Sequence, residues 1–258
     1  MATASKQPRV HDEPAYVLHR HDWSESSLIL EVFSRQYGRM AVVAKGVKRP
    51  TSQFRPVLLP LQPLRLGWGG DAEVRTLKSA HWQGGHVMPS GDALLAGCYL
   101  NELLLKLLQR DDPYPVLFEH YAQAVAALAQ TQVPQTAVLR AFELLLLREA
   151  GYLPALDEEG ASLQALQPQA LYRLVPESGL QSVGHAQNSG TPGAQWQALQ
   201  LALDSPEPFA ALLQVLQSEV AERSALRQQL RTLLHYHSGV RVFQTRQLMV
   251  DAQRLGAR

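Results

Sequence analysis

The stretch Ser27–Ala44, SLILEVFSRQYGRMAVVA, contains two apolar runs separated by a short polar turn. The first run is Ser27–Phe33, the second is Arg39–Ala44, and Gln36–Arg39 supplies the glycine-containing connection. Short apolar runs that are rich in β-branched residues and bounded by turn residues are typical of β-strands. The stretch therefore predicts a β-hairpin.

Three more candidate strands flank this hairpin. Ala15–His19 precedes it, while Val57–Trp68 and Glu73–Ala80 follow it. Pro60 and Pro63 interrupt the fourth run, which favours an edge or bent strand there. Five short strands in one segment predict a small antiparallel barrel. The OB-type barrel is the five-stranded version, and it commonly binds single-stranded nucleic acid.

The pattern changes to a helical period after Pro89, where leucines recur every three to four residues. We predict a helix capped by Ser90 or Asp92, and a mixed segment with a hairpin at 171–183. Three further helical segments are expected at Pro115–Ala129, Ala137–Ala150 (ended by Gly151) and, as two or three helices, Trp196–His237.

The predicted fold class is α+β and multi-domain: a five-stranded OB-type barrel precedes a mostly α-helical domain with a small β-hairpin insertion that lacks zinc. The expected segments are a flexible N-terminus at 1–14, the barrel domain at 15–85 and the helical domain at 86–258, which includes the insertion at 155–195 and a basic tail at 240–258.

Composition narrows the functional class. The single cysteine, Cys98, excludes an internal disulfide framework and a multi-cysteine zinc site. The N-terminus lacks the apolar core of a signal peptide, and the apolar runs are too short to span a bilayer, so we expect a cytoplasmic protein with no membrane partner. No cofactor is expected.

Charge is distributed unevenly along the chain. Residues 1–85 carry 12 Lys and Arg against 7 Asp and Glu, residues 86–217 carry 5 against 13, and residues 218–258 carry 7 against 3. Basic ends around an acidic middle indicate a polyanion-binding surface on particular elements, although a solvated basic face is an alternative.

The most basic stretch, Val42–Pro56, contains four cations and no acidic residue. We predict that these cations, with others on neighbouring strands and turns, line one groove that follows the phosphates of a nucleic acid. The predicted DNA contacts are Arg35, Arg39, Lys45, Lys48, Arg49, Arg55, Arg65, Arg75 and Lys78. Candidate base-stacking residues, each of which is alternatively a core residue, are Trp23, Phe33, Tyr37, Phe54 and Trp68.

Catalytic motifs are absent from the sequence: it has no phosphate-binding loop, nucleophile elbow, His-Glu-x-x-His pair or Cys-x-x-Cys pair. The best cluster is His19, His21 and Asp22, which makes a metal-dependent hydrolase a weak alternative. We therefore expect a binding protein without catalytic residues.

Several short motifs follow one another along the chain. In the N-terminal part they are AYVLH at 15–19, WSESSL at 23–28, Gly38-Arg39, VAKG at 43–46 and EVRTL at 73–77. In the helical part they are YLNEL at 99–103, LRAFE at 139–143 and Leu153 after Gly151-Tyr152. Each motif is weak by itself, but their order and spacing are jointly specific, and by them the chain resembles the RecO family of bacterial recombination mediators.

The resemblance implies binding of single- and double-stranded DNA and annealing of complementary strands. It also implies action with RecR to load RecA onto DNA coated by single-strand binding protein, whose acidic C-terminal tail is recognised. Many relatives carry a four-cysteine zinc module after Gly-Tyr-Leu-Pro, where this chain has Asp157, Glu158 and Glu159.

For the acidic tail we expect contacts from Arg140 and, two turns along the same helix, Arg148; an ordinary surface arginine is the alternative for Arg140. The arginines near the C-terminus either extend the DNA path or form a solvated face. An OB-fold RNA-binding protein is an alternative function, because it would use the same groove and stacking residues.

Overall fold

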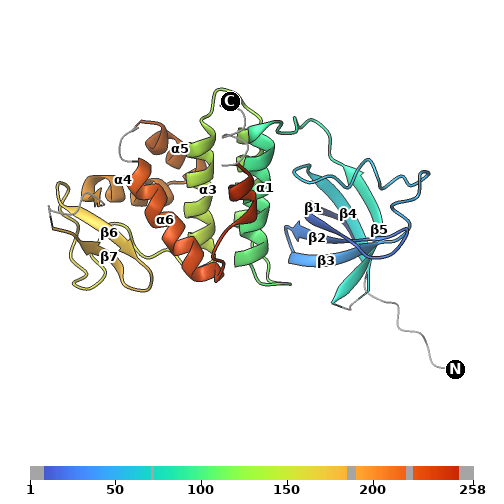
Figure 1. Cartoon of the computed structure of the whole chain (residues 1–258), viewed down its shortest axis with the longest axis horizontal. Helices are drawn as coiled ribbons and strands as arrows, with labels where there is room; N and C mark the ends of the chain where they lie inside the picture. Colours follow the sequence, from blue (N-terminus) through green and yellow to red (C-terminus); the bar gives the residue numbers. More distant parts are fainter. Residues whose placement is uncertain (1–8, 71–72, 185–189, 219–222, 250–258) are drawn as a thin grey trace. The chain divides into compact units, whose positions relative to one another are not determined.

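The computed structural model describes residues 9–70, 73–184, 190–218 and 223–249. The chain, drawn in sequence colours in Figure 1, divides into two compact units, the first reaching Ala129 and the second starting at Gln130. We expected the division near residue 85, but the two helices that follow the barrel cluster with it. Residues 1–8, 185–189 and 250–258, which belong to the expected flexible N-terminus, insertion and basic tail, lie outside the described residues.

Five strands form the sheet of the first unit: β1 (Arg9–Asp22), β2 (Leu28–Ser34), β3 (Gly38–Ala44), β4 (Leu64–Gly69) and β5 (Val74–Trp82). They close into a barrel in the order β1-β2-β3-β5-β4, because β1 pairs with both β2 and β4. The predicted five-stranded sheet followed by helices is thus confirmed. The expectation of a purely antiparallel barrel is wrong for one pair, since β3 and β5 run parallel.

Two expected boundaries also need correction. β1 begins at Arg9, so residues 9–14 belong to the barrel and not to a flexible N-terminus. Residues 57–63 contain no named strand, and the fourth strand begins only at Leu64, directly after Pro63. Proline lacks the N–H that a strand needs for its ladder, which explains the late start.

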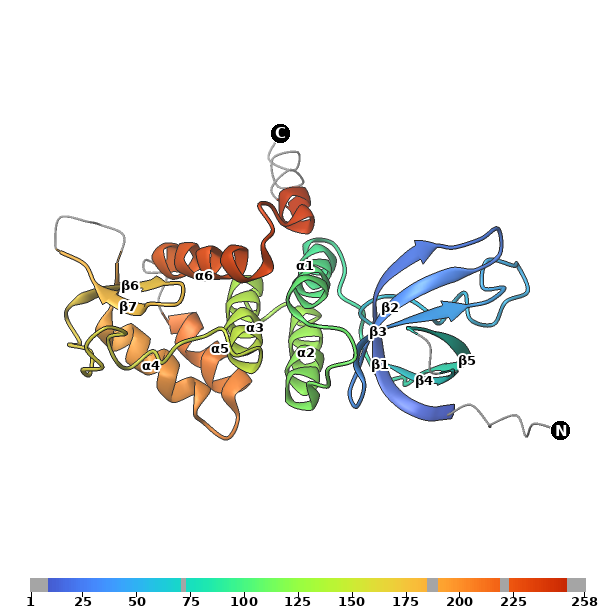
Figure 2. The same ribbon diagram turned by 90° about the horizontal axis from the view of Figure 1, so that it is seen from below.

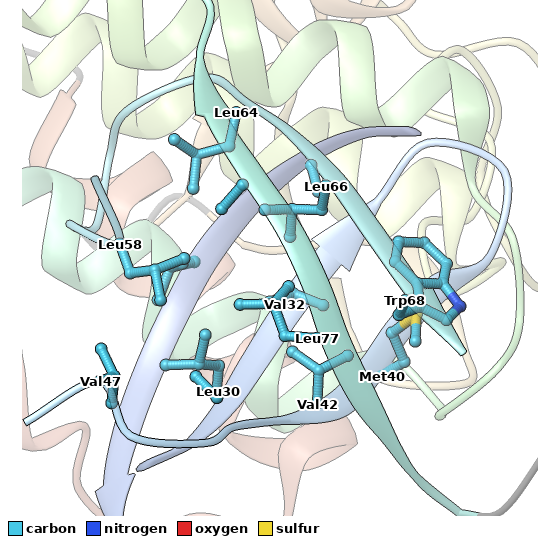
Figure 3. Packing of buried hydrophobic residues seen from close by; sticks show 14 residues of the cluster. Leu30, Val32, Met40, Val42, Val47, Leu58, Leu64, Leu66, Trp68 and Leu77 are labelled. Carbon is cyan, nitrogen blue, oxygen red and sulfur yellow. The ribbon is translucent and has the colours of Figure 1, made fainter. Parts of the chain in front are cut away.

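The barrel interior is filled by alternate residues of the strands, as the period of two requires. Leu30 and Val32 of β2, with Met40 and Val42 of β3, are fully buried there (Figure 3). Trp68 of β4 also belongs to this core and is only 2% exposed. The hairpin quoted first from the sequence therefore supplies much of the barrel core.

The outer face of β1 and β2 is covered by helices of the same unit. α1 (Asp92–Leu107) and α2 (Pro115–Leu128) lie beside the barrel (Figure 2). Tyr16 and Phe33 each place a ring centroid 5.5 Å from Phe118 of α2. Burial, followed by the charge of Glu119, raises the pKa of Tyr16 to about 12. This aromatic layer joins the barrel to α2.

Helix capping differs from the expectation for α1. Gly91 is the N-cap residue and no side chain caps the helix, so neither Ser90 nor Asp92 has the predicted role. Asp92 instead lies in the first turn, where a negative charge is favourable to the helix dipole.

The second unit contains α3 (Gln135–Glu149), α4 (Gly193–Leu203), α5 (Pro208–Ser218) and α6 (Arg223–Ser238), with a small sheet of β6 (Leu171–Val175), β7 (Gly179–Ser182) and β8 (Thr191–Pro192). α3 ends where Gly151 takes a positive φ of 74°, as predicted from the glycine. Within the described ranges no helix has the length and hydropathy needed to cross a membrane.

Candidate nucleic-acid interface

The loop between β1 and β2 is joined to the turn that follows β3. The amide of Lys48 donates to the carbonyl of Ser26 at 2.9 Å, and the amide of Gly46 donates to the Ser27 hydroxyl at 3.4 Å. The Lys48 ammonium also donates to the carbonyl of Ser24 at 2.9 Å. Three hydrogen bonds between segments about twenty residues apart thus hold both loops at one end of the barrel.

An open depression of about 390 Å³ lies between these two loops. Lys45 and Arg49 supply its positive charge, and both are exposed and form no ion pair within the described residues. No acidic residue lines it. The lining residues are Trp23, Ser24, Ser26, Ser27, Val43, Lys45, Gly46 and Arg49.

A second depression, of about 190 Å³, shares the turn after β3. It is lined by three cations, Arg20, Lys48 and Arg55, around an apolar floor. Arg55 is exposed and has no ion-pair partner in the described part of the chain, while Arg20 donates only to the carbonyl of Leu58, at 3.5 Å. Arg20 is not among the nine predicted contacts; the expected strand ended at His19, whereas β1 continues to Asp22 and carries Arg20 to this depression.

Lys48 is held by the protein itself. Its ammonium lies 2.7 Å from the carboxylate of Asp22, besides its bond to Ser24. An ammonium with two fixed acceptors has less capacity to contact a phosphate than a free one. Lys48 therefore positions the β1–β2 loop, whereas Lys45, Arg49 and Arg55 present unneutralised charge.

Five of the nine predicted cations are paired within the first unit, namely Lys48, as described above, and four arginines. Each of the four arginine pairs joins residues that are far apart in the sequence or on different strands. The pairs are Arg35 with Glu119 at 2.7 Å, Arg39 with Glu31 at 3.5 Å, Arg65 with Asp12 at 3.6 Å and Arg75 with Asp111 at 2.6 Å. The expected single groove of nine cations is therefore not what the structure assembles.

Glu31 is the centre of the most buried of these ion pairs. Its carboxylate is bound by Arg39 and by Arg110, and Arg110 also contacts Glu73 at 3.2 Å. Burial lowers the pKa of Arg39; Glu31 acts against this and Arg110 adds to it. The side chains of Arg39 and Glu31 are 17% and 7% exposed, so this network stabilises the unit and offers little to a ligand.

Lys78, the ninth predicted cation, is exposed on β5 and forms no ion pair in the described residues. It lines neither depression. The structure thus groups Lys45, Lys48, Arg49 and Arg55, adds Arg20, and leaves Lys78 by itself.

The aromatic candidates separate by exposure. Phe33 and Trp68 are buried at 0% and 2%, so for these two the alternative role of a core residue is the one that the structure shows. Phe54 is half-buried against the barrel core, and Tyr37 is 38% exposed with its ring edge against Trp68. Trp23 is 66% exposed and lines the larger depression. Trp23 is therefore the candidate that lies beside unpaired cations.

The histidine cluster does not assemble a metal site. The rings of His19 and His21 are 4.4 Å apart, and burial followed by the charge of His21 lowers the pKa of His19. The Asp22 carboxylate is bound by Lys48. No group of three or more His, Cys, Asp or Glu side chains that suits a metal ion occurs among the described residues.

The two arginines expected to bind a peptide tail are engaged inside the second unit. Arg140 lies 2.5 Å from the buried carboxylate of Glu143 and is 13% exposed. Arg148 lies 3.1 Å from the Asp204 carboxylate and donates to the carbonyl of Leu203 at the end of α4. The side chains of Arg148 and Asp204 are 40% and 52% exposed, so Arg148 is the more accessible arginine.

The segment after Gly-Tyr-Leu-Pro is closed by hydrogen bonds. The Glu159 carboxylate accepts from the Ser162 hydroxyl at 2.7 Å and from the amide of Ser182 on β7 at 3.2 Å. The Ser162 bond, followed by the Ser182 bond, lowers the pKa of Glu159. These two donors occupy the carboxylate, and the one cysteine of the chain is Cys98 on α1, so a four-cysteine zinc module does not form here.

Comparison with known proteins covers nearly the whole chain. A family model described as "Recombination protein O N terminal" matches residues 9–85, and one described as "Recombination protein O C terminal" matches residues 88–245.

Two relatives named "DNA repair protein RecO" are similar over nearly their full length. The one from Polaromonas sp. (strain JS666 / ATCC BAA-500) is 59% identical over 248 residues, which is 96% of this chain and 98% of the relative. The one from Albidiferax ferrireducens (strain ATCC BAA-621 / DSM 15236 / T118) is 60% identical over 249 residues, with the same coverage. The chain belongs to the recombination protein O (RecO) family.

Proposed function

We propose that this protein acts in DNA repair and recombination as a mediator that binds DNA without catalysing a reaction. The observation that carries this is the set of unpaired cations Lys45, Arg49 and Arg55 around two acid-free depressions at one end of the barrel. Membership of the RecO family supports the cellular role.

We take the closed five-stranded barrel to be of the OB type. Such barrels bind oligonucleotides with the face of strands 2 and 3 and with the loops L12 and L45. Here Phe33 of β2 packs on α2, which covers part of that face. The β1–β2 loop, which corresponds to L12, remains open and borders Lys45 and Arg49. DNA therefore binds at the loop end.

Binding is governed by phosphate neutralisation. Each cation that contacts a phosphate releases counterions, so the affinity falls with salt, with a slope of about 0.7 per contact for single strands. Neutralising two strands also lowers their mutual repulsion, which accounts for annealing. Single- and double-stranded DNA are both ligands in this proposal, and no nucleotide cofactor is needed.

The partners in the proposal are RecR, RecA as the protein that is loaded, and the acidic tail of single-strand binding protein. For the tail, Arg148 is the preferred contact over Arg140. Its ion pair with Asp204 is exposed, so replacing Asp204 by a carboxylate of the peptide costs little free energy. Leu201, three residues before Asp204 on α4, is 73% exposed and offers an apolar neighbour. Docking on the tail would raise the local concentration of the DNA-binding end.

The test is fluorescence anisotropy of labelled single-stranded DNA over about 50 to 200 mM salt. The triple variant Lys45→Gln/Arg49→Gln/Arg55→Gln should lose affinity, and its salt slope should fall by about 2 for three lost contacts. Lys106→Gln, on the exposed side of α1, is the matched single-charge control and should bind normally.

A second triple variant, Arg227→Gln/Arg231→Gln/Arg241→Gln, tests the alternative path along α6 and the residues after it. Loss of binding in this variant with unchanged binding in the barrel triple would overturn the proposed location. Competition by RNA of the same sequence tests the RNA-binding alternative, which predicts the stronger competitor to be RNA.

A further inference from the structure

Trp23 is exposed at the start of the β1–β2 loop, directly after Asp22. Its side chain is 66% exposed, whereas Trp68 and Trp196 are buried at 2% and 0%. The indole is therefore not needed to fill a core. It borders a depression whose other large side chains are the cations Lys45 and Arg49.

The loop that carries Trp23 is held in place by hydrogen bonds. The amides of Trp23 and Ser24 both donate to the carbonyl of Ser27, at 3.3 and 3.4 Å. The Ser24 hydroxyl accepts from the amide of Ser27 at 3.2 Å, and its carbonyl accepts from Lys48. A loop that is ordered before binding loses less entropy when a ligand arrives.

The size and chemistry of the depression suit one nucleotide. Its volume of about 390 Å³ falls in the range of small-molecule sites, and it combines an aromatic face with two cations and no acidic residue. Bases stack on exposed aromatic rings, and Lys and Arg bind phosphates. Trp23 is presented by the β1–β2 loop, and Lys45 and Arg49 are presented by the turn that follows β3.

We propose that Trp23, Lys45 and Arg49 form a subsite for one unpaired nucleotide, with the base stacked on Trp23 and the phosphate held by Lys45 and Arg49. This rests on the proposed function and names the form of DNA that the site prefers. A base within a duplex is already stacked on both faces, and exposing it costs a few kcal/mol. The subsite therefore favours single strands, while the cations alone do not.

Lys48 is a positioning residue for this subsite. Its ammonium is bound by Asp22 and by the carbonyl of Ser24, the residue next to Trp23. Removing the ammonium while keeping the apolar stem, as in Lys48→Met, should loosen the loop. A direct phosphate contact would lower the salt slope in this variant, whereas a positioning role leaves the slope unchanged.

The experiment compares labelled oligo(dT) of about 16 nucleotides, the upper site size of one OB-type barrel, with a duplex of the same length. Trp23→Ala should weaken binding of the single strand roughly 5- to 150-fold, the range that corresponds to one lost base stack. Binding of the duplex should change less than about twofold on the same argument. Trp23→Phe should recover most of the affinity, because a phenyl ring still stacks.

Trp82→Ala is the matched control, since Trp82 belongs to the same unit, is 51% exposed and does not line the depression. Intrinsic fluorescence gives a second readout. Oligo(dT) should quench the wild-type protein, and Trp23→Phe should remove most of that quenching while binding persists by anisotropy.

The results separate the two proposals. If the barrel triple variant loses binding but Trp23→Ala binds both DNA forms normally, the nucleotide subsite is overturned and DNA binding at the loop end stands. Equal losses for single strand and duplex in Trp23→Ala also overturn it. If the triple variant binds normally, the proposed function fails at this location whatever the Trp23 variants do.

Discussion

The hydroxyl of Tyr121 donates a hydrogen bond of 2.5 Å to Asn101 Oδ1 in the interior of the first unit. Asn101 in turn donates from Nδ2 to the carbonyl of Leu18 at 3.1 Å. One buried amide thus joins α1, α2 and strand β1. Buried polar groups need such partners, because leaving them without one costs the free energy of desolvation.

Replacing this amide should destabilise the first unit. We expect Asn101→Ala to lower the free energy of unfolding by about 1–3 kcal/mol, because the Leu18 carbonyl loses its donor and Tyr121 loses an acceptor. Urea denaturation followed by near-ultraviolet circular dichroism measures this. Lys106→Ala, on the exposed face of α1, should change stability by less than about 0.5 kcal/mol. Equal effects of the two variants would contradict the assigned role.

The carboxylate of Glu31 should also contribute to the free energy of unfolding of the first unit. Glu31→Gln leaves Arg39 and Arg110 without their shared anion, and Arg39 is largely buried, so we expect a loss of about 3 kcal/mol in unfolding free energy. Urea denaturation of the wild type and the variant gives the difference.

The matched control is Asp12→Asn, which removes an exposed partner of Arg65. A surface pair of this kind contributes about 0–1 kcal/mol. A Glu31→Gln protein as stable as the Asp12→Asn protein would show that the buried network adds no stability.

The stability of the loop that the Glu159 carboxylate closes should decrease at acid pH. The pKa of Glu159 is lowered in the folded protein by its bonds to Ser162 and Ser182, so its contribution is present above the ordinary value of 4.5 and is lost as the pH falls below it. Hydrogen exchange of the Ser182 amide should therefore accelerate, relative to the intrinsic rate, when the pH drops below this value. In Glu159→Gln that pH dependence should disappear. Persistence of the same pH profile in Glu159→Gln would assign it to another group.

Substitutions of Arg148 and of Asp204, which form an exposed ion pair, should change the affinity for an acidic peptide in opposite directions. Arg148→Gln should weaken binding of a peptide that has several aspartates and an apolar C-terminus about fivefold, because a charge-assisted hydrogen bond is lost. Asp204→Asn should strengthen binding, since it removes the anion that competes for Arg148. Isothermal titration calorimetry measures both.

Arg227→Gln, which alters an exposed arginine on α6, is the charge-matched control for this pair of variants. Weaker peptide binding in Asp204→Asn would place the peptide elsewhere, as would equal losses in Arg148→Gln and Arg227→Gln. DNA binding should be unchanged in all three variants if the two functions use separate residues.

Local pattern was enough to predict most of the elements of this protein. The apolar runs on either side of Gln36–Arg39 became β2 and β3, and the glycine at 151 ended α3 as expected. These features depend on side-chain period and on the backbone freedom of single residues, which neighbouring residues in the sequence define.

Pairing and exposure were decided by tertiary structure alone. Phe33 and Trp23 are both aromatic residues of the predicted barrel domain and were equal candidates for base stacking, yet α2 covers Phe33 and Trp23 is 66% exposed. Arg35 and Lys45 likewise carry the same charge, but Glu119 neutralises only Arg35. The covering helix and the neutralising acid come from segments more than eighty residues away from these side chains. Because burial and ion pairing are interactions across space, only the folded chain separates the residues that hold it together from those that are left for a ligand.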